Sequence, residues 1–404
     1  MVTARGAENS TPTVALTLDS ALQLALENSP VLRAAGGRVE AAAGRVTQAK
    51  TWSNPELELV IEDWPLRKNR GYADAKRTIG LSQAVLFPGK RSLSKQIGVA
   101  GVKLSAADLA LRRVELVREV KIGYFRVLTL ERQVEVSVQL LAMADASVAM
   151  ARKRSDAGAA AYQEQLRAEV LAEQARVEKG DLERERSAAR QTFAVLLGRP
   201  DLSGARLTDS LIETPAVSLL ADFTAGSLAA HPGLQAAQMN LERAELDHRR
   251  ARLEPYPDLK VGVAAGEVGE TGESIGQVSF SLPLPLFDRG KGTRQEARAN
   301  IVVATAELHS VQQELQRDVT NAVGRYRAAS EHVDNYRTRI LPKVDEALRL
   351  VQAGYEEGKF GFADLVDTQR TTAEVQMTYL TKLFEMSAAR AELEALLATP
   401  TPKS

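Results

Sequence analysis

Residues 86–91 read Leu86-Phe87-Pro88-Gly89-Lys90-Arg91, and residues 286–291 repeat the pattern as Leu286-Phe287-Asp288-Arg289-Gly290-Lys291. Five further pairs of segments occur in the same order at an offset of about 200 residues, and self-similarity at a fixed period indicates a duplicated unit. The pairs are Asn28-Ser29-Pro30 with Ala230-His231-Pro232, Ser53-Asn54-Pro55-Glu56-Leu57 with Pro255-Tyr256-Pro257-Asp258-Leu259, Tyr124 with Tyr326, Gly158 with Gly358, and Leu196-Leu197-Gly198-Arg199-Pro200 with Leu396-Leu397-Ala398-Thr399-Pro400.

The repeat predicts the domain organisation. We expect two structural repeats, residues 17–200 and 224–400, each with the order helix, strand pair, long helix, hairpin turn and returning helix. The Pro-, Gly-, Ser- and Asp-containing residues 201–223 are then a connector. Residues 1–16 are expected to be a flexible N-terminal segment, and residues 401–404 a C-terminal tail.

Short alternating segments predict two strand pairs. In residues 56–64, Leu57, Leu59 and Ile61 alternate with mainly acidic residues. In residues 78–87, apolar residues alternate mainly with small or polar ones. The second repeat has corresponding segments that begin at residues 259 and 278. A period of two is typical of strands with one apolar face and one polar or small face.

Long helices follow each strand pair. No proline lies between Pro88 and Pro200, and apolar residues recur at helical spacing from residue 90 to residue 157. A helix of roughly 68 residues would be about 100 Å long. We expect turns at 158–161 and 358–361, returning helices at 162–197 and 362–397, and a kink at Pro342 in the second long helix.

Composition excludes several classes of protein. Among the 404 residues, 52 basic side chains balance 52 acidic ones, which argues against a nucleic-acid binder. Without cysteine there is no disulfide, thiolate metal site or cysteine nucleophile, and the four histidines have no ligand spacing. We therefore expect no metal site, no cofactor and no enzyme activity. The sequence contains no uninterrupted apolar run of about 18 residues, so we expect no transmembrane helix. The N-terminus shows no secretory signal, so the chain is either cytosolic or a mature chain without its signal.

Four strands per chain leave two architectures open. In one, a four-stranded sheet caps the helices of a soluble scaffold or adaptor without a pore. In the other, the strands cross a membrane, where an open sheet edge is prohibitively costly. Four strands cannot close a barrel, but three copies would give 12 strands, within the range of outer-membrane barrels.

The repeated element order resembles the TolC family of outer-membrane efflux factors over residues 17–398. The most specific residues are Asn54-Pro55-Glu56-Leu57 before the first strand, residues 81–91 after the second strand, and Gly354-Tyr355-Glu356-Glu357-Gly358-Lys359-Phe360-Gly361-Phe362-Ala363-Asp364-Leu365-Val366-Asp367 at the second hairpin. The Asn-Pro-Glu-Leu entry to an acidic strand resembles the heavy-metal, cobalt-zinc-cadmium branch of that family.

The resemblance implies a mainly α fold with a four-stranded β contribution: a TolC-like α-helical barrel and a 12-stranded trimeric β-barrel. Such a homotrimer is a passive exit duct in the outer membrane of a Gram-negative bacterium, with a long periplasmic extension. It receives substrate from an inner-membrane pump, of the resistance-nodulation-division type, through a periplasmic adaptor protein. The cargo implied by the heavy-metal branch is metal cations.

The resemblance also implies a periplasmic gate formed by four residues. Asp364 and Asp367 match the paired aspartates of the closed aperture, and as two rings of three carboxylates they would attract cations. The alternative is a plain first helical turn, where aspartate is favoured by the helix dipole. Glu164 and Tyr355 match a pair that bridges the hairpins. The family's arginine is replaced by Phe360, so a Tyr355–Glu164 hydrogen bond is the most that carries over, and Glu164 could equally be a solvated surface residue.

The two hairpin tips are the expected docking points for the adaptor. Glycine at each tip fits a helix C-terminus that needs a left-handed residue. The expected docking residues are Gly158, Ala159 and Ala160 at the first tip, and Gly358, Lys359, Phe360 and Gly361 at the second.

Overall fold

The computed structural model describes residues 15–63, 74–158, 160–211 and 228–397, which are mostly helical with one larger sheet. The chain divides into two compact units. The helical unit combines Met1–Arg33, Ala110–His231 and Glu314–Ser404, and the sheet unit combines Ala34–Leu109 and Pro232–Gln313. Each unit therefore takes residues from both predicted repeats, so the compact division runs across the repeats rather than between them.

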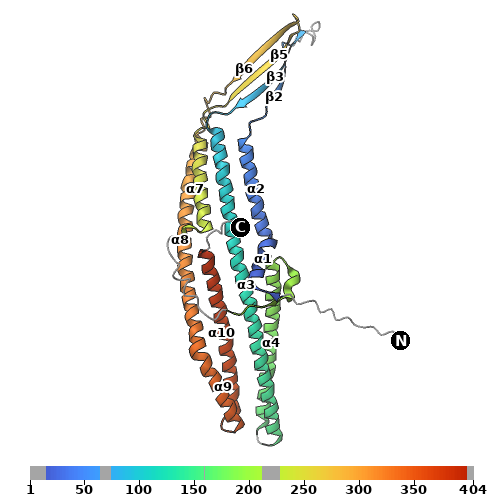
Figure 1. The fold of residues 1–404 in the computed structure, drawn as a ribbon, viewed down its shortest axis with the longest axis vertical. Coiled ribbons are helices and arrows are strands. Elements are labelled where there is room, and N and C mark those ends of the chain that lie inside the picture. The colour runs from blue at the N-terminus through green and yellow to red at the C-terminus, as the bar shows by residue number, and fades with distance from the viewer. Residues whose placement is uncertain (1–14, 64–73, 159, 212–227, 398–404) are drawn as a thin grey trace, which may run out of the picture. The chain divides into compact units, whose positions relative to one another are not determined.

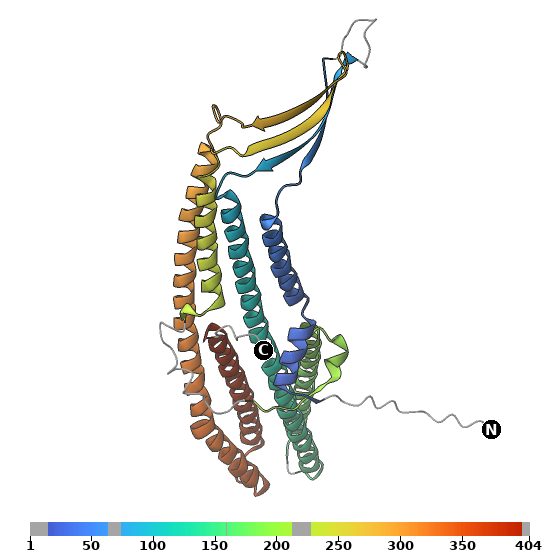
Figure 2. The ribbon, with the colours of Figure 1, turned by 45° about the horizontal axis from the view of Figure 1, so that its top comes forward.

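The sheet unit contains four antiparallel strands in the order β2-β3-β5-β6. The strands lie side by side in both views (Figures 1 and 2). Their bounds are β2 Glu56–Glu62, β3 Lys76–Val85, β5 Leu259–Val268 and β6 Glu273–Ser281. The same unit holds most of α2 (Pro30–Lys50) and α7 (Pro232–Ala251), together with the N-terminal parts of α3 (Lys90–Asp156) and α8 (Lys291–Asn335).

The strand register gives the sheet one apolar and one polar face. Leu57 pairs with Leu81, and Leu81 pairs with Val263, which in turn pairs with Val278. These large apolar side chains form one continuous exposed row across all four strands, joined on the same face by Leu59, Ile79 and Phe280. The opposite face carries Glu56, Glu58, Thr78, Ser82, Lys260 and Ser279. The predicted alternation is therefore found as two chemically different faces.

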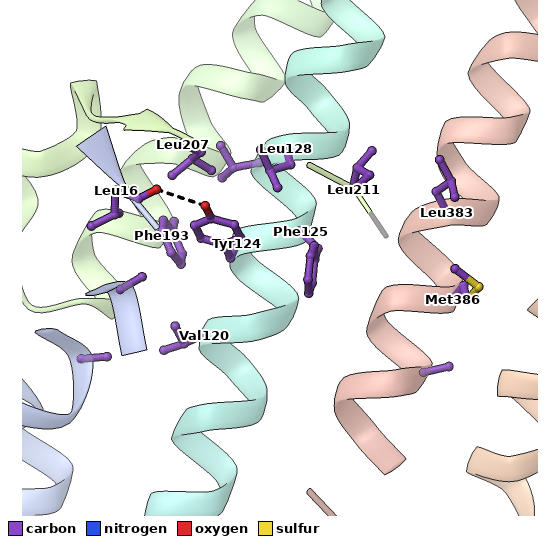
Figure 3. Packing of buried hydrophobic residues seen from close by; sticks show 14 of the residues in the cluster. Leu16, Val120, Tyr124, Phe125, Leu128, Phe193, Leu207, Leu211, Leu383 and Met386 are labelled. Atoms are coloured by element: carbon purple, nitrogen blue, oxygen red, sulfur yellow. Dashed lines mark hydrogen bonds between the residues drawn. The ribbon is translucent and has the colours of Figure 1, made fainter. Parts of the chain in front are cut away.

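The helical unit has its core around Tyr124 of α3, a side chain with no exposed surface. The Tyr124 ring packs edge-on against Phe193 of α4 (Tyr162–Leu196), with ring centroids 5.9 Å apart. The Tyr124 hydroxyl lies 3.0 Å from the Leu16 carbonyl oxygen (Figure 3) and 2.8 Å from Oδ2 of Asp209. Asp209 Oδ2 also accepts the Leu18 amide at the start of α1 (Leu18–Asn28) at 2.7 Å.

The structure corrects the predicted N-terminal segment and connector. Ala15–Leu16 forms strand β1, which pairs in parallel with β4 (Arg206–Leu207), and Leu16 is buried in the core. Residues 15 and 16 are therefore not part of a flexible segment. The predicted connector includes β4 and most of the 3-10 helix η2 (Pro200–Gly204), while its residues 212–223 lie outside the described residues. A two-residue strand is too short to show a periodic pattern, and its pairing partner lies far along the chain.

Two helical hairpins complete the helical unit, and Figure 1 shows the partners of each hairpin side by side. The first joins α3 to α4, and the second joins α9 (Leu341–Glu356) to α10 (Phe362–Leu397). The interruption expected at Pro342 is present as a π-helical turn, Tyr336–Ile340, between α8 and α9. Proline lacks an amide hydrogen and cannot donate to a helical carbonyl, so the regular hydrogen-bond pattern is broken near it.

One helix of the described chain, α3, contains an 18-residue stretch that is long and apolar enough to cross a membrane by length and composition. This stretch is apolar on average hydropathy and is not an uninterrupted apolar run of the kind considered in the sequence. A single stretch of this kind carries no argument for a membrane span, because the core helix of a soluble protein passes the same test.

Candidate functional site at the hairpin tips

Glycines with positive φ end the first helix of each hairpin. Gly158 has a φ of 71° and Gly358 a φ of 75°, a conformation that costs other residues about 1–2 kcal/mol. The Gly158 amide donates to the Ser155 carbonyl at 2.9 Å, and the Gly358 amide donates to the Tyr355 carbonyl at 3.1 Å. The two tips are thus closed by the same local chemistry.

The second tip is further ordered by Phe360. The amides of Lys359 and Phe360 both donate to the Gly354 carbonyl, at 2.7 and 3.3 Å. A Cβ at Gly354 would lie 2.2 Å from a carbon of the Phe360 ring, so the ring rests directly on the helix backbone. Phe360 is nevertheless 44% exposed, which leaves part of an aromatic face at the tip open to a partner.

Tyr355 and Glu164 join the two hairpins. The Tyr355 hydroxyl donates to Oε1 of Glu164 at 3.3 Å, so the hydrogen bond expected from the sequence is present. Arg154, in the last turn of α3, lies 3.8 Å from the same oxygen and stacks over the Tyr355 ring at 5.3 Å. Burial raises the pKa of Tyr355 and outweighs the neighbouring Arg154, which lowers it. The tyrosine is therefore a neutral donor at physiological pH.

Asp364 and Asp367 both lie on exposed surface in the first two turns of α10. Asp364 Oδ2 accepts the Gly361 amide at 3.0 Å, which satisfies one of the unpaired amides at the helix start. Within the described residues, Asp367 has no hydrogen bond or ion pair. Three residues apart, the two carboxylates lie on one side of the helix, away from the buried Leu365 and Gln369.

The remaining predicted tip residues are exposed or half-buried. Ala160 is half-buried, Gly361 is exposed, and Lys359 forms an ion pair with Glu357 at 2.5 Å. Ala159 lies outside the described residues.

Sequence reasoning missed one residue of this region. Arg154 supplies the cation that the sequence seemed to lack, because it comes from the first hairpin rather than from the position of Phe360. A basic residue in the last turn of a helix was a weak signal for it. The described part of the chain contains no group of three or more His, Asp or Glu side chains placed to hold a metal ion.

A family model described as outer membrane efflux protein matches residues 21–199 and 226–399, most of the chain. The chain is 28% identical over 390 residues to the cobalt-zinc-cadmium resistance protein CzcC of Cupriavidus metallidurans, covering 95% of this chain and 90% of that protein. It is 27% identical over 295 residues to the nickel and cobalt resistance protein CnrC of the same organism, covering 72% of this chain and 69% of that protein.

The fold is similar to that of the outer membrane protein VceC from Vibrio cholerae. The TM-score is 0.80 and the match covers 94% of this chain and 95% of the other, at 17% identity. At that identity the likeness concerns the fold alone.

Proposed function

The chain belongs to the outer membrane efflux protein family, and from that premise we propose how it assembles and what it carries. Members of this family are the outer-membrane channel components of efflux systems, with a long helical extension into the periplasm. The chain is such a component. Its assembly, partners, gate and cargo are the parts that we argue from its own residues.

We propose that three copies form one duct with a 12-stranded barrel. The supporting observation is the sheet itself. Its apolar face exposes Leu57, Leu59 and Phe280 by 64–72%, and an exposed apolar area of this kind is typical of contact with a membrane or a partner. Its polar face would line the channel. Within the described residues, β2 and β6 each pair on one side only, and an open edge in lipid must be closed by another chain.

The duplication is also part of the proposal. Each half of the chain supplies two adjacent strands followed by a helix that begins at a lysine, Lys90 in α3 and Lys291 in α8. A ring of three chains would then consist of six similar units. Such pseudo-symmetry explains how one chain can match both of its neighbours.

We further propose that the hairpin tips dock a periplasmic adaptor and so couple the duct to an inner-membrane pump, of the resistance-nodulation-division type. The exposed Phe360 ring and the ion-paired Lys359 give the second tip one apolar and one polar contact. The residues expected to dock at the first tip, Gly158, Ala159 and Ala160, are all small. The second hairpin is therefore expected to contribute more of the contact energy.

Four residues form the proposed periplasmic gate: Glu164, Tyr355, Asp364 and Asp367. The Tyr355–Glu164 hydrogen bond holds the two hairpins of one chain together. The paired aspartates would bring six carboxylates into one aperture of a trimer, where mutual repulsion is relieved by a bound cation. We propose heavy-metal cations as cargo, because both metal-resistance relatives align over most of their length.

One experiment tests the assembly. The protein purified from outer membranes in detergent is measured by light scattering and then reconstituted in planar bilayers. We expect a particle of three 43.8 kDa chains that conducts ions. A monomeric particle without conductance would contradict the proposed duct.

A further inference from the structure

An ion pair between a buried lysine and a half-buried aspartate joins the two halves of the chain where strands become helices. Lys90 Nζ, with a side chain only 6% exposed, lies 2.9 Å from Oδ1 of Asp258. The Phe87 amide donates to the same oxygen at 2.7 Å, and the Phe87 ring stacks on Tyr256 with centroids 4.7 Å apart. Burial alone raises the pKa of Asp258, but the two hydrogen bonds outweigh it and hold the pKa below its usual value. We call this arrangement the Lys90–Asp258 clamp.

The clamp lies where β3 and β5 meet, the two strands that hydrogen-bond the first strand pair to the second. Phe87 and Lys90 follow β3, and Asp258 immediately precedes β5. Gly89, with a φ of 92°, turns the chain into α3 just before Lys90. The clamp therefore forms where the end of one strand, β3, lies beside the start of the next strand in the sheet, β5.

A second, corresponding set of residues forms no such clamp within the described chain: Phe287, Lys291 and Glu56. Phe287 follows β6 and is fully exposed. Lys291 opens α8 after Gly290, whose φ is 64°, and it makes no ion pair within the described residues. Glu56 begins β2, follows Pro55 as Asp258 follows Pro257, and has a side chain 68% exposed.

The sheet order places Phe287 and Lys291 at one edge of the sheet and Glu56 at the other. β6 is one edge and β2 is the other. If copies of the chain close a ring, β6 of one copy meets β2 of the next, as β3 meets β5 inside the chain. Lys291 and Phe287 would then lie next to Glu56 of the neighbouring copy, in the same arrangement in which Lys90 and Phe87 lie next to Asp258 within one chain.

We propose that Lys291 and the Phe287 amide clamp Glu56 of the neighbouring copy, and that this clamp is the main polar lock between copies. The inference rests on the trimeric assembly proposed above. Lys260 already lies 2.9 Å from Oε2 of Glu56, which leaves Oε1 for the neighbour. Asn54 takes the place that Tyr256 has inside the chain, so the ring stacking is not repeated. The charged pair must carry more of the energy between copies than it does within one.

Charge reversal with rescue tests the lock. We expect Lys291→Glu and Glu56→Lys each to increase the rate at which the detergent-purified trimer dissociates by about tenfold or more, because close charge pairs across interfaces couple by about 1.5 kcal/mol upwards. The double variant should recover most of the stability. Lys95→Glu is the matched control, since Lys95 is an exposed lysine one turn after Lys90 in α3 and is not part of the proposed lock.

Chemical cross-linking gives a direct readout that does not depend on folding of a variant. A carbodiimide joins an ammonium to a carboxylate only when they touch. In trimers mixed from isotopically light and heavy copies, we expect a light-to-heavy link between Lys291 and Glu56, lost in Glu56→Gln.

The outcomes separate the two proposals. Suppose that the wild-type particle is trimeric and conducts ions. Absence of a Lys291–Glu56 link between copies, or failure of the double variant to recover stability, would then overturn the lock alone. A wild-type particle that is monomeric and does not conduct would overturn the duct and the lock together.

Discussion

The Tyr355 hydroxyl donates a hydrogen bond to Oε1 of Glu164 across the two helical hairpins, with the oxygens 3.3 Å apart. Tyr355 is 4% exposed, whereas Glu164 is half-buried and is also approached by Arg154. One phenol thus ties the second hairpin to a carboxylate and a guanidinium that both belong to the first. Separating the hairpins must break this bond and expose the buried ring.

Tyr355→Phe should favour the open aperture. The change removes the hydrogen bond but keeps the ring, and a hydrogen bond to a charged group contributes about 1.5–3 kcal/mol. We expect the ratio of open to closed channels to rise by about tenfold or more. Single-channel recordings of the reconstituted protein measure that ratio.

Tyr162→Phe is the matched control for that substitution. Tyr162 begins α4 and is 63% exposed, so loss of its hydroxyl should leave gating unchanged. Equal effects of the two substitutions would argue that Tyr355 does not act through Glu164.

The double variant Asp364→Asn with Asp367→Asn should weaken block of the conductance by divalent cations. Asparagine keeps the side-chain oxygen that accepts the Gly361 amide, so the start of α10 is preserved while both charges are lost. We expect the concentration of Co²⁺ or Zn²⁺ needed for half block to rise by about tenfold, since charges near 4 Å interact by about 1–4 kcal/mol. Asp345→Asn, at an exposed aspartate of α9, serves as the control. Unchanged block in the double variant would assign both aspartates to helix capping alone.

Most secondary structure could be predicted because its signals are local. The helix expected over residues 90–157 is found as Lys90–Asp156, and the turn glycines Gly158 and Gly358 have the positive φ that their positions required. Periodic apolar residues and the absence of proline specify such a helix without knowledge of its neighbours.

Contacts between distant segments could not be predicted in the same way. Leu16 is buried by pairing with Leu207, and nothing within a two-residue strand reveals a partner so far along the chain. The approach of Arg154 to Glu164 depends on how the α3–α4 turn rotates one helix about the other. That rotation is set by packing, so the sequence pointed to Glu164 and Tyr355 but not to Arg154.

Gly354→Ala should loosen the second hairpin tip. The added Cβ would lie 2.2 Å from the Phe360 ring, which must leave its place on the helix backbone. We expect the Lys359 and Phe360 amides, which donate to the Gly354 carbonyl, to exchange with deuterium about tenfold faster. Gly324→Ala is the control. A Cβ added at Gly324 would meet no atom of another segment within 4 Å, so alanine should stabilise α8 by about 0.5–1 kcal/mol. Unchanged exchange at the tip of Gly354→Ala would show that Phe360 does not order it.

Glu394 should make the stability of the helical unit depend on acid pH. Its Oε2 lies 2.6 Å from Lys121 Nζ and its Oε1 lies 2.8 Å from Arg390 Nε. Burial alone raises the pKa of Glu394, but the hydrogen bonds and charges of the two cations outweigh it, and the net pKa is lowered. Because the folded-state pKa lies below the unfolded one, this stabilisation is present above the ordinary pKa of glutamate and is lost as pH falls through the lower folded value. The wild type should therefore lose helical stability below about pH 4.5 more steeply than Glu394→Gln does. Thermal unfolding followed by circular dichroism at pH 7 and pH 4 measures the difference, and parallel acid dependence in both proteins would contradict the assignment to Glu394.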